Sequence, residues 1–562
     1  MAYSIGVDYG TGSGRVVLLD LDEAAEVAVA VIPYQHGVID TIFPATGEKL
    51  PPDWALQHPM DYLDVLRRGI PAVLAETGVH PADVIGIGID FTSCTVLPVT
   101  QTGEPLCMMA EWAEHPHAWP KLWKHHAAQP IADRMNQLAR ERDEDFLTRY
   151  GGRISSEWYF PKLIEVFEAD PDVYQACDAF VEATDWIVWY LTGNLRRNSC
   201  TAGYKALWSE DGGMPAEDFF QAVNPGFTRP LDKLGDVFYP LGTRAGQLRE
   251  HVAEQLGLHA HVAVAVGNVD AMVAVPSVGV SRPGSLVMVM GTSICHLTVS
   301  HEEVRLPGIT GVVKGGALPG LYAYEAGQAA VGDMFEWFVK TWVPERYLDE
   351  ATRRHASIYE VLEEEAARLS PGQNGLVAFD WWNGNRSILG DADVSGMIFG
   401  LTLATSTADV YRALLESTAY GTRRIIDNFA EHGIVIDELV ACGGLPQKSP
   451  LLMQIYADIC GLPVVVRDSK EIPARGAAMF GAVAAGAKVG GFDSITSASD
   501  VLAAPIQRTY QPNAAAREAY DRLYQIYREL HEYLGEKNVH LLHRLKQVRV
   551  RSLNDAFVNQ LV

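Results

Sequence analysis

Two short segments of the same design, about 280 residues apart, constrain the fold of this chain more than any other feature. The first covers Tyr3–Asp20, and its two β-rich runs are joined by small residues at Gly10–Gly14. The second covers Ser285–Val299 and turns at Gly291-Thr292-Ser293. Small residues between two short apolar runs are typical of a β-hairpin. The pair predicts two related domains that face one another, although the identity is too low for a sequence repeat.

Further strands and helices are predicted around each hairpin. In the first half, Glu26–Pro33 and the fully apolar Val84–Asp90 favour strands, and the spacing of apolar residues over Asp61–Glu76 favours a helix. In the second half, the strand-like Leu439–Cys442 leads into Gly443-Gly444, and the helical stretch Pro450–Cys460 follows. The second half therefore places a glycine pair between a strand and a helix.

The length of 562 residues suggests two large domains or three smaller ones. A polar Pro/Gly break at Ser281–Gly284 favours a boundary there, giving domains over 1–281 and 282–505 and a helical tail over 506–562. The tail contains the amphipathic stretch Ala514–Leu534 and then the basic residues Arg544, Lys546, Arg549 and Arg551.

Charge and cysteine usage exclude several classes of function. The 45 Lys and Arg residues face 70 Asp and Glu, a formal net charge of −25, which disfavours nucleic acid and anionic membranes but not a small anionic ligand. The seven scattered cysteines form no Cys-x-x-Cys pair and fit a reducing compartment. No signal peptide is visible, and Asn268 and Asp270 interrupt the most apolar stretch, Val262–Val280. We therefore expect a cytoplasmic protein.

Common nucleotide and metal motifs are missing. The sequence has no G-x-x-x-x-G-K-[ST], its early glycines lack the G-x-G-x-x-G spacing, and no H-E-x-x-H occurs. The four histidines His115, His117, His125 and His126 suggest a metal site, but adjacent histidines usually lie on opposite faces of an element. Hydrogen-bonded or solvated histidines are the favoured interpretation.

The two hairpin turns could together hold a polyphosphate. Asp8 ends a strand beside Gly10-Thr11-Gly12-Ser13, whose backbone N–H groups and hydroxyls can bind phosphate oxygens while the carboxylate holds Mg²⁺, directly or through water. Gly291-Thr292-Ser293 offers the same donors. A structural turn alone explains either one, but the pair, together with Gly443-Gly444 before a helix, favours a phosphate clamp.

Asp270 is a second candidate because it lies inside an apolar segment that is expected to be buried. A buried carboxylate is costly unless it is paired or functional. The alternative is a structural Asp that caps the helix beginning near Ala271, and the two roles are compatible.

These residues together resemble the FGGY carbohydrate kinases and, within that family, the ribulokinases. Gly396–Leu401, followed by Asp409-Val410, Ala413 and Glu416, is similar to the second signature of the family. The other matching segments, spread over nearly the whole chain, are Val7–Thr11, Gly88–Thr92, Leu122–His126, Ser155–Trp158, Thr201–Lys205, Asp270, Met290–Ser293, Glu325–Gln328, Asp380–Gly384 and Gly443-Gly444.

The sequence departs from the family pattern at three places. Ser449 stands where many members have Asn, which bears on the contacts to the adenine base. The first family signature, around Trp158–Lys162, fits poorly. Phe91-Thr92-Ser93-Cys94 replaces the Arg-Glu pair of glycerol kinases, so glycerol is not an expected substrate.

The resemblance implies an α/β fold in which two ribonuclease-H-like domains of the actin/hexokinase/Hsp70 type flank a cleft. It implies an N-terminal sugar-binding domain, a C-terminal nucleotide-binding domain, and ATP-dependent phosphorylation of the 5-hydroxyl of L-ribulose in L-arabinose catabolism. The partners would be L-ribulose and ATP with Mg²⁺, without nucleic acid or membrane; a homodimer is left open.

The same resemblance assigns roles to individual residues. Asp270 would be the catalytic base and Asp8 the Mg²⁺ ligand. ATP would be bound by Gly10, Thr11, Gly12, Ser13, Gly291, Thr292, Ser293, Gly443 and Gly444, and the sugar by Ser93, Lys205, Asp270 and Glu325.

Four alternatives stay open. The substrate could be another pentulose or a pentitol, such as D-ribulose, ribitol or xylulose, or the chain could be a nucleotide-gated binding protein of the actin fold. Lys205 and Glu325 could form a surface ion pair, and Trp123 and Trp158 could pack on the sugar or fill the core.

Overall fold

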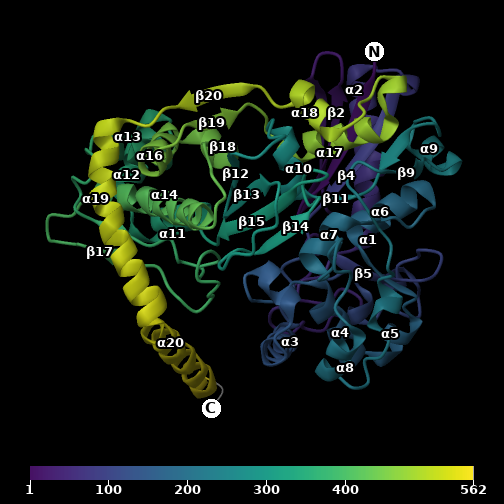
Figure 1. Ribbon diagram of the computed structural model, residues 1–562, viewed down its shortest axis with the longest axis horizontal. Helices are drawn as coiled ribbons and strands as arrows, with labels where there is room; N and C mark the ends of the chain where they lie inside the picture. The colour runs from purple at the N-terminus through teal and green to yellow at the C-terminus, as the bar shows by residue number, and fades with distance from the viewer. Residues whose placement is uncertain (561–562) are drawn as a thin grey trace.

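The computed structural model describes residues 1–560, and their side chains as far as Arg549, so the side chain of Arg551 lies outside the described part. The chain forms two lobes, each built around a mixed sheet of seven strands, as Figure 1 shows. We call them the N-terminal and C-terminal lobes after the hairpin that begins each sheet.

The N-terminal sheet is built on the first predicted hairpin. β1 (Tyr3–Tyr9) pairs antiparallel with β2 (Ser13–Asp20) and parallel with β4 (Val84–Phe91). Every residue of β1 and β4 is buried, because helices cover both faces of these central strands. The remaining strands complete the order β3-β2-β1-β4-β10-β9, with β11 beside β4: β3 (Ala25–Pro33), β9 (Arg244–Gln247), β10 (Ala263–Ala265) and β11 (Asn268–Val269).

The C-terminal sheet repeats this plan. β12 (Ser285–Met290) pairs antiparallel with β13 (Ile294–Ser300) and parallel with β18 (Glu438–Gly443). The full order is β14-β15-β13-β12-β18-β19-β20, which adds β14 (Gly311–Lys314), β15 (Tyr322–Gln328), β19 (Val464–Arg467) and β20 (Ile506–Tyr510). In both sheets the first strand lies between its hairpin partner and a parallel strand, so the prediction of two related domains is confirmed.

Two helices connect the lobes at the centre of the molecule. α10 (Asp270–Ser277) follows β11, and α17 (Ile472–Ala485) follows β19 but packs on β1 and β4 of the other lobe. In Figure 1, α17 accordingly lies among the strands of the N-terminal lobe. α10 and α17 also contact each other, and Gly476 permits this because a Cβ there would lie 2.2 Å from the Val273 carbonyl oxygen. A segment late in the chain therefore completes the core of the first lobe.

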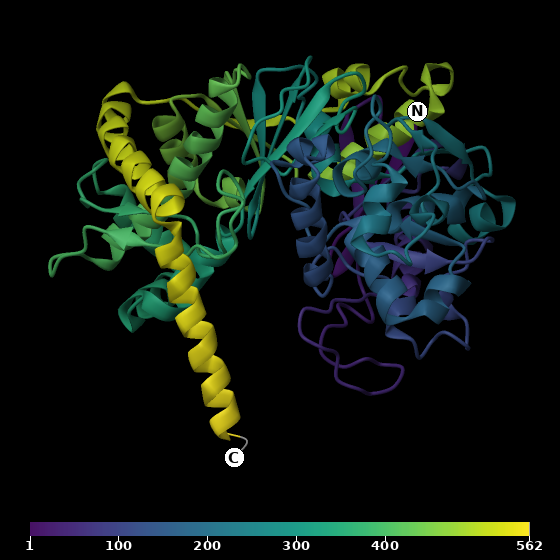
Figure 2. The ribbon, with the colours of Figure 1, turned by 60° about the horizontal axis from the view of Figure 1, so that its bottom comes forward.

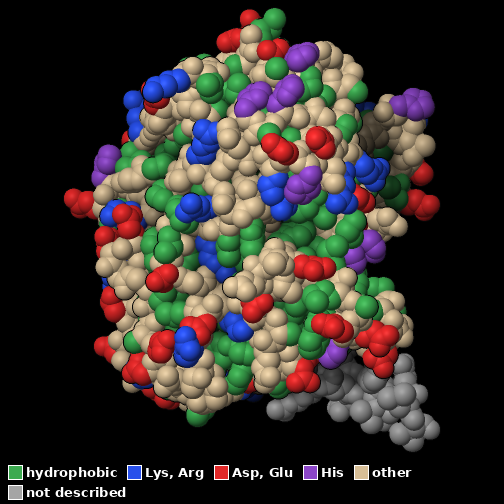
Figure 3. Space-filling view, turned by 90° about the vertical axis from the view of Figure 1, so that its right-hand side faces the viewer, with side chains coloured by type: hydrophobic (Ala, Val, Ile, Leu, Met, Phe, Trp, Pro, Cys, Tyr) green, Lys and Arg blue, Asp and Glu red, His purple; other side chains and the backbone are tan. Residues whose placement is uncertain are grey.

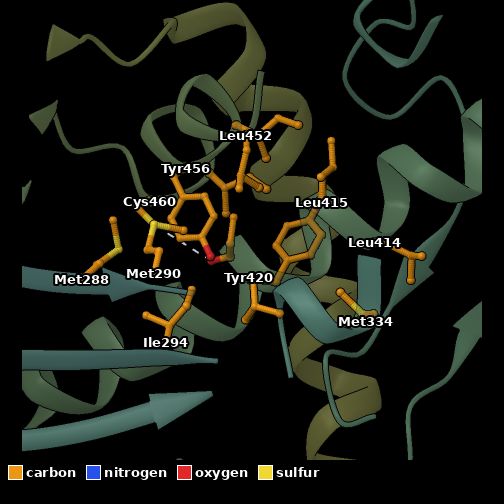
Figure 4. Close-up of a cluster of buried hydrophobic side chains, with 14 of the residues drawn as sticks. Met288, Met290, Ile294, Met334, Leu414, Leu415, Tyr420, Leu452, Tyr456 and Cys460 are labelled. Atoms are coloured by element: carbon orange, nitrogen blue, oxygen red, sulfur yellow. Dashed lines mark hydrogen bonds between the residues drawn. The ribbon is translucent and has the colours of Figure 1, made fainter. Parts of the chain in front are cut away.

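The core of the C-terminal lobe is large and apolar. Helices α14 (Thr407–Glu431) and α16 (Pro450–Cys460) cover one face of the sheet. A capping box fixes the start of α14, because Ser406 and Asp409 exchange hydrogen bonds between side chain and backbone. Figure 4 shows the strand residues Met288, Met290 and Ile294 packed near Leu414, Leu415, Tyr420, Leu452, Tyr456 and Cys460.

Smaller elements complete both lobes. In the N-terminal lobe they are β5 (Val96–Val99), β6 (Ala179–Glu182), β7 (Arg197–Asn198), β8 (Phe238–Tyr239), α1 (Pro59–Asp64), α2 (Ile70–Thr77), α3 (Gln129–Glu141), α4 (Tyr159–Ala169), α5 (Pro171–Ala176), α6 (Ala183–Thr192), α7 (Ser199–Lys205), α8 (Glu217–Val223) and α9 (Glu250–Leu256). In the C-terminal lobe they are β16 (Val377–Ala378), β17 (Ile398–Phe399), α11 (Gly332–Trp342), α12 (Glu345–Arg354), α13 (Ile358–Ala367), α15 (Gly444–Lys448) and α18 (Ile495–Leu502).

The tail predicted as helical over 506–562 begins instead with β20, a strand of the C-terminal sheet, and is helical only from Ala514. It runs along the C-terminal lobe before it projects from the molecule (Figure 2). α19 (Ala514–His531) ends three residues before the predicted Leu534, because Glu532–Lys537 forms a wider π-helical turn around Gly535. α20 (Val539–Gln560) follows. The predicted helix over Asp61–Glu76 is likewise divided by a π-helical turn, Val65–Gly69.

Within residues 1–560, none of the helices combines the length and the apolar character needed to span a bilayer. On the face shown in Figure 3, the Lys and Arg side chains are interspersed with Asp and Glu.

Candidate active site

A cavity of about 660 Å³ lies between the two lobes and is lined by residues of both. Its N-terminal wall includes Thr11, Ser93, Lys205 and Asp270. Its C-terminal wall includes Ser293, Glu325 and Arg386. The structure therefore brings together members of the predicted phosphate turns and all four of the predicted sugar-binding residues.

Three aspartates lie where the central strands β1 and β4 of the N-terminal sheet end. Asp8 at the end of β1 is the register partner of Asp90 on β4, and Asn268 of β11 lies beside Asp90 on the other side. Asp270, two residues beyond Asn268, begins α10. Burial raises the pKa of Asp90 well above its usual range, and the charges of Asp8 and Asp270 raise it further. The site thus concentrates negative charge in a poorly solvated place.

Asp90 is a buried carboxylate whose surroundings leave it unsatisfied. Neither of its carboxylate oxygens has a hydrogen-bond partner among the described residues, although both are buried. Asp8 is partly compensated, because its Oδ2 lies 3.5 Å from Arg15 Nη1, yet burial still raises its pKa. Buried polar groups without partners are rare and call for an explanation. Sequence reasoning named Asp8 and missed Asp90, which stood only within a segment quoted for the family resemblance.

The carboxylate pair fits a magnesium ion that also binds phosphate. The described residues contain no group of three or more His, Cys, Asp or Glu placed to hold a metal ion by themselves. Mg²⁺ needs no such cage, because it keeps several waters and binds through one or two carboxylates plus substrate phosphates. Asp8 and the unpartnered Asp90 could supply those carboxylates.

Asp270 stands at the wall of the cavity as the first residue of α10. Its Oδ1 accepts a hydrogen bond of 2.7 Å from the backbone N–H of Ala271. Removal from water, followed by the charge of Asp8, raises the pKa of Asp270 to about 7. Val269 is the N-cap of α10, so Asp270 is its first residue and not its cap, and the hydrogen bond to Ala271 leaves Asp270 at the cavity wall.

Other side chains hold the first phosphate turn in place. Gly10 N–H donates to the Ser13 carbonyl over 3.0 Å and closes the turn. Trp123 Nε1 donates to Thr11 Oγ1 over 3.0 Å, and Gln57 Nε2 donates to the Thr11 carbonyl over 2.8 Å. Trp123 therefore holds the turn and also lines the cavity, so packing on the sugar stays a prediction.

The second turn is fixed by its neighbours. Gly291 N–H donates to the Ser293 carbonyl over 2.9 Å, and the N–H of Val331, just before α11, donates to the Thr292 carbonyl over 2.8 Å. Gly443, with φ of +97°, lies in register with Met290 at the end of β12. A Cβ on Gly443 would lie 2.4 Å from the Met290 carbonyl oxygen, so this strand end requires glycine. The predicted glycine pair thus lies beside the second turn.

The predicted sugar residues form a buried cluster. Lys205 Nζ at the end of α7 lies 3.7 Å from Glu325 Oε2 on β15, and their side chains are only 12% and 11% exposed. The alternative of a surface ion pair is therefore wrong. Burial lowers the pKa of Lys205, but the charges of Glu325 and Glu157 outweigh it, so the net shift is upward. The ammonium stays charged in the cavity, and Ser93 Oγ, which also lines the cavity, is buried with no hydrogen-bond partner within the described part of the chain.

One aromatic side chain, Trp158, and one basic side chain, Arg386, also line this half of the cavity. The Trp158 ring lies with its centroid 6.0 Å from Lys205 Nζ and packs edge-on against Tyr150. It thus lines the cavity and belongs to the core at once. Arg386 brings a second cation, which sequence reasoning missed. The available signal was its place two residues after the quoted segment Asp380–Gly384.

The histidines form hydrogen bonds, as the sequence favoured. His125 Nε2 lies 3.0 Å from Glu165 Oε2, which also contacts Lys121 Nζ at 3.2 Å. His117 Nδ1 lies 3.2 Å from the same ammonium. This buried network lies in the N-terminal lobe and belongs to no metal-binding group among the described residues.

Comparisons with known proteins agree with this geometry. The models of the N-terminal and C-terminal domains of the FGGY family of carbohydrate kinases match residues 3–276 and 286–485. The chain is 52% identical to a ribulokinase of Anoxybacillus flavithermus over 97% of this chain and 96% of that protein. It is also 52% identical to a ribulokinase of Shouchella clausii over 99% of each.

Solved structures share the fold. A xylulose kinase from Rhodospirillum rubrum superposes with a TM-score of 0.77 at 22% identity, covering 95% of this chain and 99% of that one. A Plasmodium falciparum glycerol kinase with ADP gives a TM-score of 0.74 at 16% identity, covering 95% and 98%. The predicted two-domain α/β fold is therefore confirmed.

Proposed function

The chain belongs to the FGGY family of carbohydrate kinases, and on that premise we propose that it is an ATP-dependent ribulokinase. The reaction would transfer the γ-phosphoryl group of ATP to the 5-hydroxyl of L-ribulose, as a step of L-arabinose catabolism. The observation that carries the proposal is the placement of Asp270 in a cavity that is also lined by the buried Lys205–Glu325 pair and by one residue of each predicted phosphate turn, Thr11 and Ser293. Relatives named ribulokinase over nearly the full chain support this substrate.

In this reaction Asp270 accepts the proton of the attacking hydroxyl. A carboxyl group of pKa about 7 is a stronger base than an ordinary aspartate of pKa about 3.9. Phosphoryl transfer passes through a loose transition state, so the proton leaves late and positioning matters most. Lys205, Glu325 and the free hydroxyl of Ser93 orient the sugar, because a polyol needs both donors and acceptors.

The nucleotide is assigned to the turns and the glycine pair. Gly10, Thr11, Gly12 and Ser13 would contact phosphates from one lobe, and Gly291, Thr292 and Ser293 from the other. Gly443 and Gly444 would flank the adenosine. Asp8, with Asp90, would hold Mg²⁺, which when bound spreads the charge of the phosphate oxygens. Ser449 Oγ accepts the N–H of Leu452 at the start of α16, so its hydroxyl serves as a helix cap.

The cellular compartment and the partners of the protein are also proposals. All seven cysteines are unpaired, which supports a reducing compartment, and we propose the cytoplasm. We expect neither nucleic acid nor a membrane as a partner. Formation of a homodimer stays an open prediction.

A coupled assay of ADP release tests the proposed substrate. L-ribulose should give the highest kcat/KM in a panel that includes D-ribulose, xylulose and ribitol. A higher value for another member would replace L-ribulose with that pentulose or pentitol. ADP release that none of the sugars stimulates would favour a nucleotide-gated binding protein instead.

Replacement of Lys205 by Met tests the division of the cavity. The change keeps most of the apolar stem and removes the ammonium that faces Glu325. A hydrogen bond from a charged group contributes about 1.5–3 kcal/mol, so kcat/KM for L-ribulose should fall by roughly 10- to 150-fold. The KM for ATP should stay nearly constant. If the ATP KM rises and the sugar KM does not, Lys205 belongs to the nucleotide half of the cavity.

A further inference from the structure

We infer that the C-terminal helix α20 holds one wall of the substrate cavity in place, with His543 and Lys546 as its positioning residues. The wall is the segment 383–393 of the C-terminal lobe, here called the wall loop. The inference rests on the proposed function only in assigning this wall to the sugar half of the cavity. It gives the basic tail a role in catalysis without any contact between the tail and the substrate.

The wall loop supplies a large part of the cavity lining. Its members there are Asn383, Asn385, Arg386, Ile388, Leu389, Gly390 and Ala392. The loop is closed on itself, because Asn385 and Asp391 exchange two backbone hydrogen bonds of 2.8 Å. Asn385 Oδ1 also accepts the N–H of Leu389 over 2.9 Å. A shift of Asp391 would therefore be transmitted to the segment that carries Arg386.

Helix α20 binds the far end of this loop through a histidine and a lysine side chain. His543 Nε2 lies 2.6 Å from Asp391 Oδ2, and these side chains are 35% and 22% exposed. Lys546, one helical turn later, lies 2.7 Å from Asp393 Oδ1 and donates to the Ala392 carbonyl over 3.0 Å. His543 and Lys546 are three residues apart, so they lie on the same face of the helix. Two neighbouring side chains thus bind three consecutive residues of the loop.

A second contact brings the tail against the same loop from the turn before α20. A Cβ on Gly535 would lie 2.7 Å from Leu389 Cδ1 and 3.0 Å from the Trp381 ring. The π-helical turn Glu532–Lys537 can approach the loop this closely because its residue there is glycine. The tail therefore touches the wall loop at two separate points.

The opposite lobe holds the loop from across the cavity. Arg153 Nη1 donates to the Gly390 carbonyl over 2.6 Å. The second half of the loop, 389–393, thus lies between the N-terminal lobe and the tail, and the cavity-lining residues 383–388 directly precede these contacts. Loops that position substrate must be held by their surroundings, since a small displacement costs affinity and rate. Figure 2 shows α20 running away from the C-terminal lobe, with its first turns against that lobe.

The test uses the full-length chain carrying His543→Ala together with Lys546→Met. Partly exposed ion pairs are individually weak, so the apparent KM for the sugar should rise by about 3- to 10-fold. The KM for ATP should change by less than about twofold, because the phosphate turns lie on other strands. The matched control is Arg522→Met, whose partner Glu518, at 3.0 Å, lies with it on α19, outside the turn that contacts the wall loop. It should leave both constants unchanged.

A conservative double variant separates positioning from general stability. His543→Gln with Lys546→Arg keeps a donor at each position and should restore the sugar KM to within about twofold of the wild type. Equal rises in the sugar and ATP KM values, with no rescue, would overturn the inference, because the tail would then act on the whole fold.

A measurement that needs no substrate distinguishes a failure of this inference from a failure of the proposed function. Amide hydrogen exchange in the peptide covering 383–393 should be about 3- to 10-fold faster in His543→Ala/Lys546→Met, and unchanged in Arg522→Met. If the wild type phosphorylates none of the ketopentoses but the loop exchanges faster in the double variant, the proposed substrate fails and the inference stands. Unchanged exchange in that variant would overturn the inference whatever the substrate.

Discussion

At the scale of single residues, the site depends on carboxylates held where water is scarce. Asp8, Asp90 and Asp270 come from β1, β4 and α10, and burial raises the pKa of each. Such groups are costly for stability unless a ligand compensates them. In our proposal a magnesium-bound polyphosphate would bring a cation to Asp8 and Asp90, whereas Asp270 would face the sugar. One acidic cluster can thus serve both metal binding and proton transfer.

The substitution Asp270→Asn tests the catalytic assignment. It keeps the shape of the side chain and removes its capacity to accept a proton. We expect kcat to fall by at least about 10²-fold, the usual loss when a general base is removed, with a much smaller change in sugar affinity. Single-turnover phosphoryl transfer measures this directly. Activity within threefold of the wild type would exclude Asp270 as the base.

The raised pKa of Asp270 also predicts a pH dependence. A base must be deprotonated, and its pKa lies at about 7, so kcat/KM should fall as the pH drops below that value. The decline should approach about tenfold per pH unit well below the pKa. Since part of the shift comes from the charge of Asp8, bound Mg²⁺ should move the limb of kcat to a lower pH than that of kcat/KM. A profile flat between pH 5 and 8, at about constant stability, would contradict this role.

At the scale of elements, the close packing of glycines explains why a helix from the C-terminal half lies on the N-terminal sheet. A Cβ on Gly6 would lie 1.7 Å from the Ala474 carbonyl oxygen, and one on Gly88 would lie 1.8 Å from that of Ala477. Glycine weakens an isolated strand, so its place in two central strands has a packing reason here. α17 approaches the sheet backbone directly and fixes the strand ends that carry Asp8 and Asp90.

The substitution Gly88→Ala tests this contact. The added methyl group would meet helix backbone that cannot move aside as a side chain could, so we expect a loss of about 1–3 kcal/mol in unfolding free energy. Chemical denaturation followed by circular dichroism measures the midpoint. Gly12→Ala is the control for stability, since its Cβ would have no atom within 4 Å. Equal midpoints for the two variants would show that α17 can retreat from the sheet.

The elements that the sequence predicted well are those with a local signal. The strand Tyr3–Tyr9 and the helix Pro450–Cys460 have the predicted bounds, because apolar patterning and the flanking turns define them. The contact of α17 with β4 joins residues almost 400 positions apart. Apart from the glycines of the two elements, the sequence around them contains no local pattern that predicts this contact. Asp90 and Arg386 were missed for the same reason, since their partners come from other strands and loops.

At the scale of the whole molecule, the site exists only where the two lobes meet. Lys205 from one lobe pairs with Glu325 from the other at 3.7 Å, and Arg149 pairs with Glu303 at 2.9 Å. Arg153 reaches the Gly390 carbonyl of the wall loop. Other polar contacts also join the lobes through partly exposed side chains such as those of Arg305 and Lys314, whereas α10 and α17 join them by apolar packing. Such an arrangement permits rotation of the lobes about a packed centre.

Ligands that bridge the lobes should therefore favour a more closed form. ATP contacts both phosphate turns in our proposal, and the sugar contacts both Lys205 and Glu325, so each ligand gains contacts only when the lobes approach. Small-angle scattering of the Asp270→Asn variant, which binds without rapid turnover, should give a smaller radius of gyration with L-ribulose, ATP and Mg²⁺ together than without ligands. ATP alone should give a smaller change, because the sugar half of the cavity then stays open. Superimposable profiles at saturating concentrations of all three ligands would mean that the lobes are already in their working position, and that the rigid centre formed by α10 and α17 does not act as a hinge.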